Sequence, residues 1–167
     1  MIRVRKATVD DAEGIAQVCA DSWRDTYREL MPAETIERIL TESYNPRRIR
    51  REIMNPAGWQ GWWVVTEDGK VYGAGGGGMT SRNVCEIFIL YVDPKRQGEG
   101  IGTRLMEAIT EELKTQGAQE QWVSVAKGNT KGVPFYERCG FVQRGEQTAP
   151  GTREEEQIRA LRYWRKL

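Results

Sequence analysis

The sequence predicts a protein of the α/β (α+β) class, with one mixed β-sheet and helices on both of its faces. Strand and helix patterns follow one another along the chain in the order β-α-α-α-β-β-β-α-β-α-β-β. The run Val84–Val92 is apolar at both alternating sets of positions, which is typical of a central strand covered on both sides. A proline and the glycine-rich turn Gln97–Gly102 then separate this strand from a long amphipathic helix. No repeat or linker interrupts the chain, so residues 1–167 are predicted to form a single domain.

The N-terminal part of the chain is predicted to be one strand followed by three helices. The strand is Ile2–Ala7, and the apolar residues of the next segment share one helical face: Ala12, Ile15, Ala16, Cys19, Trp23 and Tyr27. Pro32–Leu40 is predicted to be a second helix, because proline suits a first helical turn. Asn45 is a suitable cap for a third, basic helix that ends near Met54.

A hairpin and a run of glycines mark the middle of the chain. Trp62–Glu67 and Lys70–Gly77 have strand patterns and are joined by Asp68-Gly69, a strong signal for a tight hairpin turn. Glycines are unusual inside a strand, and Gly75–Gly78 are four in a row. We interpret them as a place where a ligand or a second chain approaches the backbone closely.

The C-terminal part alternates strands with one long and one short helix. The long helix directs one apolar set inward: Ile101, Leu105, Ala108, Ile109 and Leu113. The remaining segments, in chain order, are the strand Trp122–Ala126, the short helix Thr130–Cys139, the strand Phe141–Arg144 and the final strand Gln157–Trp164. The last of these alternates only weakly, so we expect it at an edge of the sheet.

The composition excludes several classes of protein. The net charge is +1, from 25 basic and 24 acidic residues, which argues against a non-specific nucleic-acid binder. No apolar run approaches the length of a membrane span, and the N-terminus lacks the pattern of a signal peptide. Three cysteines without metal-ligand spacing suit reduced thiols, so we expect a cytoplasmic protein with no bound metal.

The chain contains no histidine, which constrains its chemistry. A Ser/His or Cys/His catalytic pair is excluded, and so are most zinc sites. Any acid–base catalysis therefore depends on Glu, Asp, Tyr, Cys, Lys, the backbone or water.

The turn Gln97–Gly102 is predicted to bind an anion. Three glycines leave backbone N–H groups unshielded at a helix N-terminus, where the helix dipole favours negative charge. A Walker loop would require a lysine after the last glycine, and here Thr103 and Arg104 follow. A dinucleotide fingerprint has a different glycine spacing and follows the first strand of its domain. The remaining functional interpretation is that the turn binds a phosphate or pyrophosphate of another kind of ligand. The competing structural explanation is a tight turn that needs glycine only for positive φ.

Two blocks of residues, in the expected order and at the expected distance, carry a family resemblance. The first comprises the end of the central strand and the glycine turn: Leu90-Tyr91-Val92-Asp93-Pro94 and Gln97-x-x-Gly100-x-Gly102. The second lies on the next strand-helix-strand: Asn129-x-x-Gly132-x-x-Phe135-Tyr136-x-x-x-Gly140-Phe141. Together they resemble the GCN5-related N-acetyltransferase (GNAT) family over nearly the whole chain. Two positions depart from the family pattern, namely Gly132 in place of a small alanine, and Pro134 within the short helix.

The resemblance implies a GNAT-like, mostly antiparallel sheet of about seven strands, with acetyl-CoA as cosubstrate. The backbone of the glycine turn would hold the pyrophosphate, the end of the central strand would pair with the pantetheine arm, and two residues of the second block would contact the coenzyme. These candidates are Gln97, Gly98, Glu99, Gly100, Ile101, Gly102 and Thr103, then Leu90, Tyr91 and Val92, and finally Asn129 and Tyr136. Asn129 is equally well explained as a helix N-cap. Lys95, Arg96 and Arg104 are either phosphate ligands or a solvated basic turn.

The same resemblance implies direct attack of an amine on the thioester, through a tetrahedral intermediate. The family places a tyrosine hydroxyl at the coenzyme sulfur, and Tyr136 matches that position as general acid. Without histidine, Glu86 is the candidate base, acting through water. Regular alternation puts Glu86 on the strand face of Phe88, Leu90 and Val92. The alternative for Glu86 is an ordinary carboxylate at a strand end.

The acceptor is predicted as a small-molecule primary amine, and the sequence does not choose among a small amine, an antibiotic, a polyamine and a protein N-terminus. Trp23 and Tyr27, with the acids Asp25, Glu29 and Glu154–Glu156, would suit a cation, although core packing of the two rings and a solvated acidic loop explain them as well. The segment Asp21–Glu29 loosely resembles bacterial polyamine acetyltransferases, which suggests a polyamine. A homodimer would be common in this family. A non-catalytic acyl-CoA-binding or sensing module is the alternative function, and a phosphotransferase is disfavoured because no phosphate-binding lysine or metal motif is present.

Overall fold

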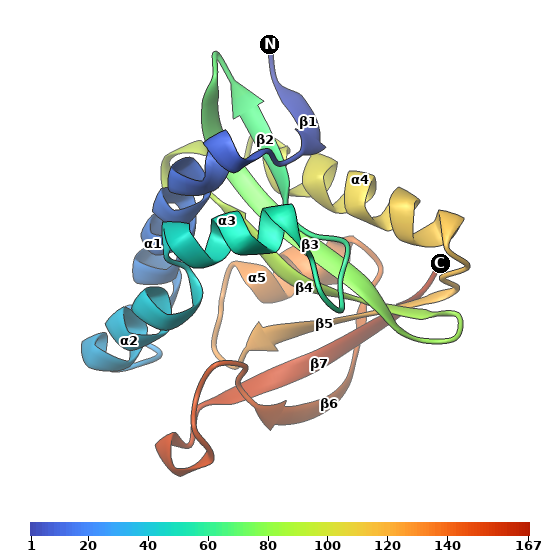
Figure 1. Ribbon diagram of the computed structural model, residues 1–167. Coiled ribbons are helices and arrows are strands. Elements are labelled where there is room, and N and C mark those ends of the chain that lie inside the picture. Colours follow the sequence, from blue (N-terminus) through green and yellow to red (C-terminus); the bar gives the residue numbers. More distant parts are fainter.

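The computed structural model describes residues 1–167 and contains one seven-stranded sheet with five α-helices around it (Figure 1). The strands are β1 (Arg3–Lys6), β2 (Trp63–Glu67), β3 (Lys70–Ser81), β4 (Val84–Val92), β5 (Glu120–Ala126), β6 (Val142–Thr148) and β7 (Arg159–Lys166). The helices are α1 (Ala12–Tyr27), α2 (Ala33–Ser43), α3 (Pro46–Met54), α4 (Ile101–Thr115) and α5 (Gly132–Arg138). The predicted fold class and the predicted number of strands are confirmed. None of these helices is both long and apolar enough to cross a lipid bilayer.

Local signals in the sequence place several element ends. The side chain of Asn45 accepts a hydrogen bond from the Arg48 N–H at 2.8 Å, and α3 begins at Pro46 as predicted. Asp68 and Gly69 have φ values of 50° and 77°, as a tight hairpin between β2 and β3 requires. These ends depend on contacts between neighbours in the chain, which is why the sequence alone predicts them.

The sheet order is β1-β2-β3-β4-β5-β7-β6, and only the β4–β5 pair is parallel. The expectation that the last strand lies at an edge is wrong, because β7 pairs with β5 on one side and β6 on the other. At this end of the sheet the edge strand is β6, whose sequence is mostly polar and whose first five residues are exposed. Tyr163 of β7 is buried, as an interior position requires.

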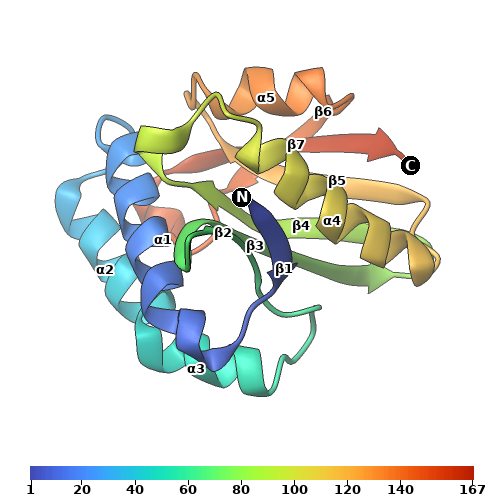
Figure 2. The ribbon, with the colours of Figure 1, turned by 90° about the horizontal axis from the view of Figure 1, so that it is seen from above.

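Helices cover both faces of the sheet. Figures 1 and 2 show α1, α2 and α3 together on one side and α4 on the other, with α5 near β5. A large apolar core lies on the α4 side and includes Ile87, Leu105, Ile109 and Val123. A second core, under α1 and α3, includes Ile15. The sheet is therefore the middle layer of three, as the sequence predicts.

Strands β4 and β5 are paired over only part of their length. The pairing joins Val84–Ile87 to Glu120–Val123 and then stops, although β5 remains paired with β7 as far as Ala126. Beyond Ile87 the two parallel strands separate, so that one edge of β4 has no strand beside it. This separation creates the cleft described below.

A β-bulge interrupts β4 at the point where the strands separate. Gly77 of β3 pairs with Ile87 and Gly76 pairs with Ile89, so Phe88 has no partner on β3. Phe88 is 43% exposed, which is unusual for a large apolar residue in a central strand. The sequence gives no sign of this bulge, because its cause is the register with β3.

The bulge changes which side chains of β4 share a face. Regular alternation predicted Glu86 on the face of Leu90 and Val92, and this prediction is wrong. Leu90 and Val92 pack with Ile87 into the core on the α4 side, and Glu86, next to Ile87 in the strand, points to the opposite face. The extra residue of the bulge reverses the alternation between Glu86 and Leu90.

The run Gly75–Gly78 packs against the chain's own loop. A Cβ atom on Gly76 would overlap the Gly61 carbonyl oxygen and the indole of Trp59, and one on Gly78 would lie 2.8 Å from the Trp59 Cα. The loop before β2 therefore crosses directly over β3. The expectation of a ligand or a second chain at these glycines is wrong, because the backbone that approaches Gly76 and Gly78 is this chain's own loop.

Candidate active site

A cleft of about 640 Å³ extends from the separation of β4 and β5 to the start of α4. Its walls are the end of β4, the middle of β5, the glycine turn and α5. All of the predicted coenzyme-binding residues except Glu99 line it. Glu86 does not line it. Two blocks that lie far apart in the sequence are thus brought together at one cleft.

The glycine turn presents bare backbone to this cleft. Gly98 and Gly100 have φ values of +83° and +80°, a region that side-chain-bearing residues rarely adopt. None of the backbone N–H groups from Gln97 to Thr103 donates a hydrogen bond to another part of the protein, whereas the Arg104 N–H bonds the Gly100 oxygen. The free N–H groups lie at the N-terminus of α4, where the helix dipole adds positive potential. The cradle therefore fits a diphosphate well.

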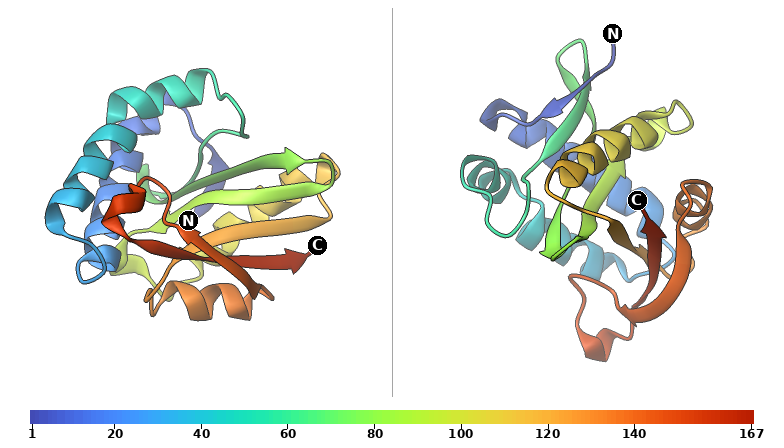
Figure 3. Two further views of the ribbon diagram at one scale, coloured as in Figure 1. Left: turned by 90° about the horizontal axis from the view of Figure 1, so that it is seen from below. Right: turned by 90° about the vertical axis from the view of Figure 1, so that its right-hand side faces the viewer.

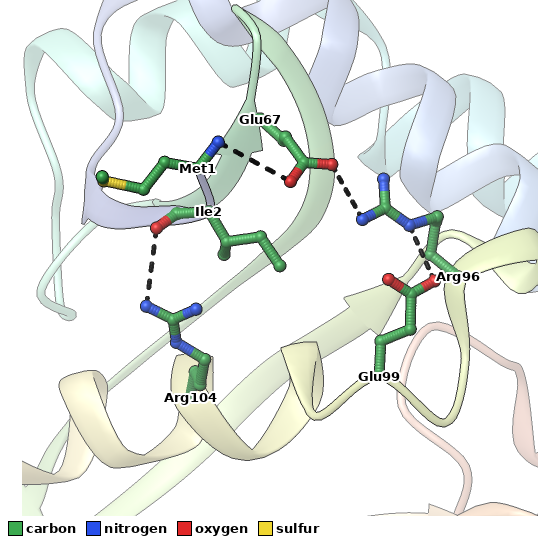
Figure 4. A network of polar contacts seen from close by, with 6 residues as sticks. All are labelled: Met1, Ile2, Glu67, Arg96, Glu99 and Arg104. Atoms are coloured by element: carbon green, nitrogen blue, oxygen red, sulfur yellow. Dashed lines mark hydrogen bonds and ion pairs between the residues drawn. The ribbon is translucent and has the colours of Figure 1, made fainter.

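The basic side chains beside this turn are mostly occupied with protein contacts (Figure 4). Arg96 bonds Glu99 at 2.8 Å and Glu67 at 3.0 Å, and it stacks on Tyr72. Hydrogen bonds to these two carboxylates raise the pKa of Arg96 above its ordinary value. Arg104 reaches the backbone oxygen of Ile2 at 3.5 Å. The turn therefore offers an anion chiefly backbone N–H groups, and its side chains brace the loop.

The free edge of β4 provides further hydrogen-bonding groups. The Asp93 N–H bonds the Tyr72 oxygen on β3 at 2.8 Å. Successive N–H groups of a strand point to opposite edges, so those of Leu90 and Val92 point away from β3, to the side that β5 has left. Leu90 and Val92, which line the cleft, thus present donors and acceptors to an extended ligand.

Tyr136 lies where α5 meets the cleft. Its ring is held edge-on by Phe135 and Phe141, with ring centroids at 5.1 Å and 5.6 Å. Its hydroxyl makes no hydrogen bond to a protein group. Trp23 Nε1 is the one fully buried polar side-chain atom that lacks a hydrogen-bond partner, so the Tyr136 hydroxyl is accessible from the cleft. Burial raises the pKa of Tyr136, with smaller contributions from Tyr27 and Cys139, so the hydroxyl remains protonated at neutral pH.

Asn129 caps the turn before α5. Its side-chain oxygen accepts hydrogen bonds from the N–H groups of Gly132 at 2.8 Å and Lys131 at 3.2 Å. The side-chain amide of Asn129 occupies the space that a Cβ on Gly132 would need, which accounts for glycine at that position. Asn129 also lines the cleft, so its amide nitrogen remains available to a ligand.

Glu86 is part of a polar network that links β4, β5 and β7. Both of its oxygens accept hydrogen bonds from Arg162, at 2.7 Å and 2.9 Å. Arg162 Nη1 also donates to the Ser124 hydroxyl oxygen at 2.7 Å. Ser124 lines the cleft at the point where the strands separate. The network therefore connects Glu86 to the cleft through Arg162 and Ser124.

A second cavity of about 210 Å³ adjoins the cleft on the α1 side of the sheet. Its lining is mainly aromatic: Trp23, Tyr27, Tyr44, Trp62, Phe88 and Tyr91. Burial raises the pKa of Tyr27 to about 12 and also raises the pKa of Tyr44 and Tyr91, so these hydroxyls are neutral. Trp23 and Tyr27, expected either as core or as acceptor-site residues, are both buried and cavity-lining.

The acidic residues predicted near an acceptor do not line this cavity. Asp25 bonds Lys131 at 3.4 Å, and Glu156 bonds Arg38 and Thr35 of α2 at 2.7 Å and 3.0 Å. Figure 3 shows the loop before β7 lying next to α2, as these bonds require. This loop contributes uncharged residues to the cavity instead.

Sequence reasoning missed three residues of the site. Phe88, Ser124 and Arg162 have no motif around them, and each reaches the site only through strand pairing. The one available signal is weak: a serine and an arginine interrupt otherwise apolar alternation in β5 and β7.

Comparison with known proteins agrees with the geometry of the site. The sequence profile described as "Acetyltransferase (GNAT) family" matches residues 20–141. An N-acetyltransferase of Bacillus subtilis, YuaI, is 28% identical over 82% of this chain and 78% of its own length. The spermidine N(1)-acetyltransferase of Thermoplasma acidophilum is 26% identical, over 84% of this chain and 88% of its own.

A solved structure shows the same fold over the full length. The crystal structure of the PaiA N-acetyltransferase from Thermoplasma acidophilum, in complex with coenzyme A, superposes with a TM-score of 0.85. It covers 100% of this chain and 99% of its own, at 23% sequence identity. The arrangement of strands and helices is therefore shared along the entire chain.

Proposed function

This chain belongs to the acetyltransferase (GNAT) family, and we propose from this premise that it transfers the acetyl group of acetyl-CoA to a primary amine. Acetyl-CoA is the cosubstrate of the family and supplies the thioester. The observation that carries the proposal is the unbroken run of free N–H groups from Gln97 to Thr103, next to the open edge of β4. Together they form a diphosphate cradle continuous with a surface for an amide-rich arm.

Binding of the coenzyme is divided between backbone and side chains. The N–H groups of the turn hold the diphosphate, and the edge of Leu90 and Val92 pairs with the pantetheine amides. One of these two N–H groups also donates to the thioester oxygen, where a donor is typically worth about 2.7–4 kcal/mol in the transition state. Asn129 binds the arm through its free amide nitrogen, since its oxygen is already engaged by α5.

The proposed proton donor is a side chain that is protonated at neutral pH. Tyr136, protonated because of its burial, donates to the departing thiolate. The amine attacks directly from the aromatic cavity, which opens beside the same part of β4. As the tetrahedral intermediate collapses, the C–S bond breaks and the thiolate takes the Tyr136 proton, while the proton lost by the amine nitrogen returns to the Tyr136 oxygen through water. This low-polarity lining disfavours the ammonium form, so a larger fraction of bound amine is neutral and nucleophilic.

Glu86 receives a different role from the expected one. A base acting through water needs a carboxylate that reaches the amine, but both oxygens of Glu86 hold Arg162 and the residue lies outside the cleft lining. In our proposal Glu86 is a positioning residue, which fixes Arg162 and, through it, Ser124.

The similarity to a spermidine acetyltransferase supports a polyamine as one candidate acceptor. The test is a thiol-release assay with acetyl-CoA and a panel of amines, paired with thermal shift by coenzyme A and by ATP. We expect stabilisation by coenzyme A and amine-dependent thiol release. Stabilisation by coenzyme A without turnover of any amine would indicate a non-catalytic acyl-CoA-binding module, and stabilisation by ATP alone would exclude the coenzyme site.

A further inference from the structure

The two cavities share a short boundary that any acceptor must cross. The residues that line both are Tyr27, Phe88, Ile89, Tyr91 and Ser124. The main cleft holds the thioester in the proposed function, so an amine bound in the aromatic cavity reaches it past this boundary. The atoms next to the amine nitrogen then lie beside these residues. Among them Ser124 is the one with an aliphatic hydroxyl, held by fixed partners.

The hydrogen-bonding capacity of Ser124 is almost fully assigned. Its oxygen accepts a hydrogen bond from Arg162 Nη1 at 2.7 Å and another from Gln147 Nε2 at 3.1 Å. A serine hydroxyl has two acceptor positions and one donor, so both acceptor positions are used. The hydrogen atom of the Ser124 hydroxyl is not donated to any protein acceptor. Ser124 is therefore a donor toward the boundary of the two cavities, and its orientation is imposed by its neighbours.

The partners of Ser124 are themselves held in place. Arg162 is gripped by both oxygens of Glu86 and lies over the ring of Trp122, 5.2 Å from its centroid. The side chains of Arg162 and Glu86 are 19% and 17% exposed, so the pair is largely shielded from water. Because the two charges cancel each other, the network delivers an oriented neutral hydroxyl to the cleft.

The aromatic cavity has no free carboxylate for a second ammonium group. Its charged lining residues are Arg48 and Glu52, which lie 3.5 Å apart as an ion pair. Glu52 also accepts a hydrogen bond from Trp62 Nε1 at 3.1 Å. A linear polyamine carries several positive charges and no oxygen. It would leave the Ser124 donor unmatched and its own distal charges unpaired.

We infer that the acceptor is a primary amine whose α-carbon carries a carbonyl group, as in an α-aminoacyl group, and whose remainder is apolar or aromatic. The carbonyl oxygen accepts the hydrogen bond that Ser124 offers, and the aromatic cavity takes the remainder. This inference rests on the proposed function and makes Ser124 a specificity-determining residue for it. It favours such an amine over the polyamine that sequence similarity suggests.

The test compares three amines with wild type and the Ser124→Ala variant. The amines are L-phenylalaninamide, 2-phenylethylamine, which lacks the carbonyl, and spermidine, and the measured quantity is kcat/KM for each. We expect wild type to prefer L-phenylalaninamide, and Ser124→Ala to lower its kcat/KM about tenfold more than that of 2-phenylethylamine. The ratio between the two proteins cancels the different basicities of the two amines. Ser124→Thr, which retains the hydroxyl, serves as the matched control and should restore the selectivity.

Two outcomes would overturn the inference while leaving acetyl transfer intact. One is spermidine as the best acceptor of wild type, and the other is an equal loss for both aromatic amines in Ser124→Ala. If no amine is acetylated, the proposed function fails. The inference is then tested by the Kd of each amine for the complex of the protein with coenzyme A, measured in place of kcat/KM. Tighter binding of L-phenylalaninamide than of 2-phenylethylamine, lost in Ser124→Ala, would still support the inference, and equal binding would contradict it.

Discussion

The proposed active site has two halves that are built in different ways: the cleft, which is the coenzyme half, and the aromatic cavity, which is the acceptor half. The coenzyme half consists mainly of backbone groups from one continuous stretch, Gln97–Thr103, with the adjacent edge of β4. The acceptor half consists of side chains from α1, α2, α3, β4, β5 and the loop before β7. In the first, glycines remove side chains so that N–H groups are exposed. In the second, bulky aromatic rings define the space.

This difference explains why one half is easier to recognise from sequence than the other. Backbone donors are the same in every chain, so the diphosphate requires only a local pattern of glycines before a helix. An acceptor is recognised by shape and by the placement of individual polar groups, such as Ser124. The coenzyme half is therefore expected to tolerate changes in side chains but not in backbone conformation, and the acceptor half the reverse.

Replacement of Tyr136, which lines the cleft and is the proposed general acid, should have the largest effect on catalysis. Tyr136→Phe removes the hydroxyl but keeps the packing against Phe135 and Phe141. We expect kcat to fall about 100-fold, because general acid catalysis is typically worth that much, with an unchanged Kd for acetyl-CoA. Burial raises the Tyr136 pKa, so ionisation of this hydroxyl should not lower the wild-type rate as pH rises through about 10, the ordinary value for tyrosine. An unaltered kcat in the variant would remove Tyr136 from the mechanism.

A change of backbone conformation should weaken the coenzyme half alone. Gly100 has a φ of +80°, so Gly100→Ala forces the turn to distort or to carry strain. We expect the Kd for coenzyme A to rise about tenfold, measured by calorimetry, since strain of this kind costs about 1–2 kcal/mol. Gly58→Ala is the matched control, because Gly58 has a φ of +81°, has open space for a Cβ, and lies outside the cleft lining. Equal weakening in both variants would contradict a specific role for the turn.

The acceptor half should respond to Glu86 without any change in coenzyme binding. Glu86→Gln leaves one acceptor oxygen where Arg162 now has two, and its NH2 group faces an Arg162 N–H donor. We expect this to loosen Arg162 and to lower kcat/KM for the amine about fivefold. The pH profile separates the two roles of this residue. A positioning residue leaves the acidic limb of the profile in place, whereas loss of that limb with a fall of 100-fold or more would show that Glu86 is the base.

The smallest catalytic effect is expected where neither half is touched. Gly76→Ala would push against Trp59 and the Gly61 carbonyl, which should lower the free energy of unfolding by about 2 kcal/mol. This corresponds to a fall in Tm of roughly 4–8 °C, with kcat and KM of the remaining folded protein unchanged. Gly145→Ala is the control, because its Cβ would meet only ordinary contacts. A drop in kcat without loss of stability would connect this strand to the site.

Much of the fold was predictable because its signals are local. The bounds of β4 and of α3 match the predictions, since an apolar run and a capped proline define them. The order of the C-terminal strands was not predictable in the same way, because β7 inserts between β5 and β6. Weak alternation suggested an edge, yet the more polar sequence of β6 indicated the edge better.

The sequence by itself determined the family, the number of strands and the glycine turn before α4, because their signals are patterns of residues close together in the chain. Only the tertiary structure decided the acceptor half. The bulge at Phe88 reversed the alternation of β4, and this turned Glu86 away from the face it was expected to share. The parting of β4 from β5 then opened the cleft beside Ser124. Both features follow from the register between strands, which no single strand encodes.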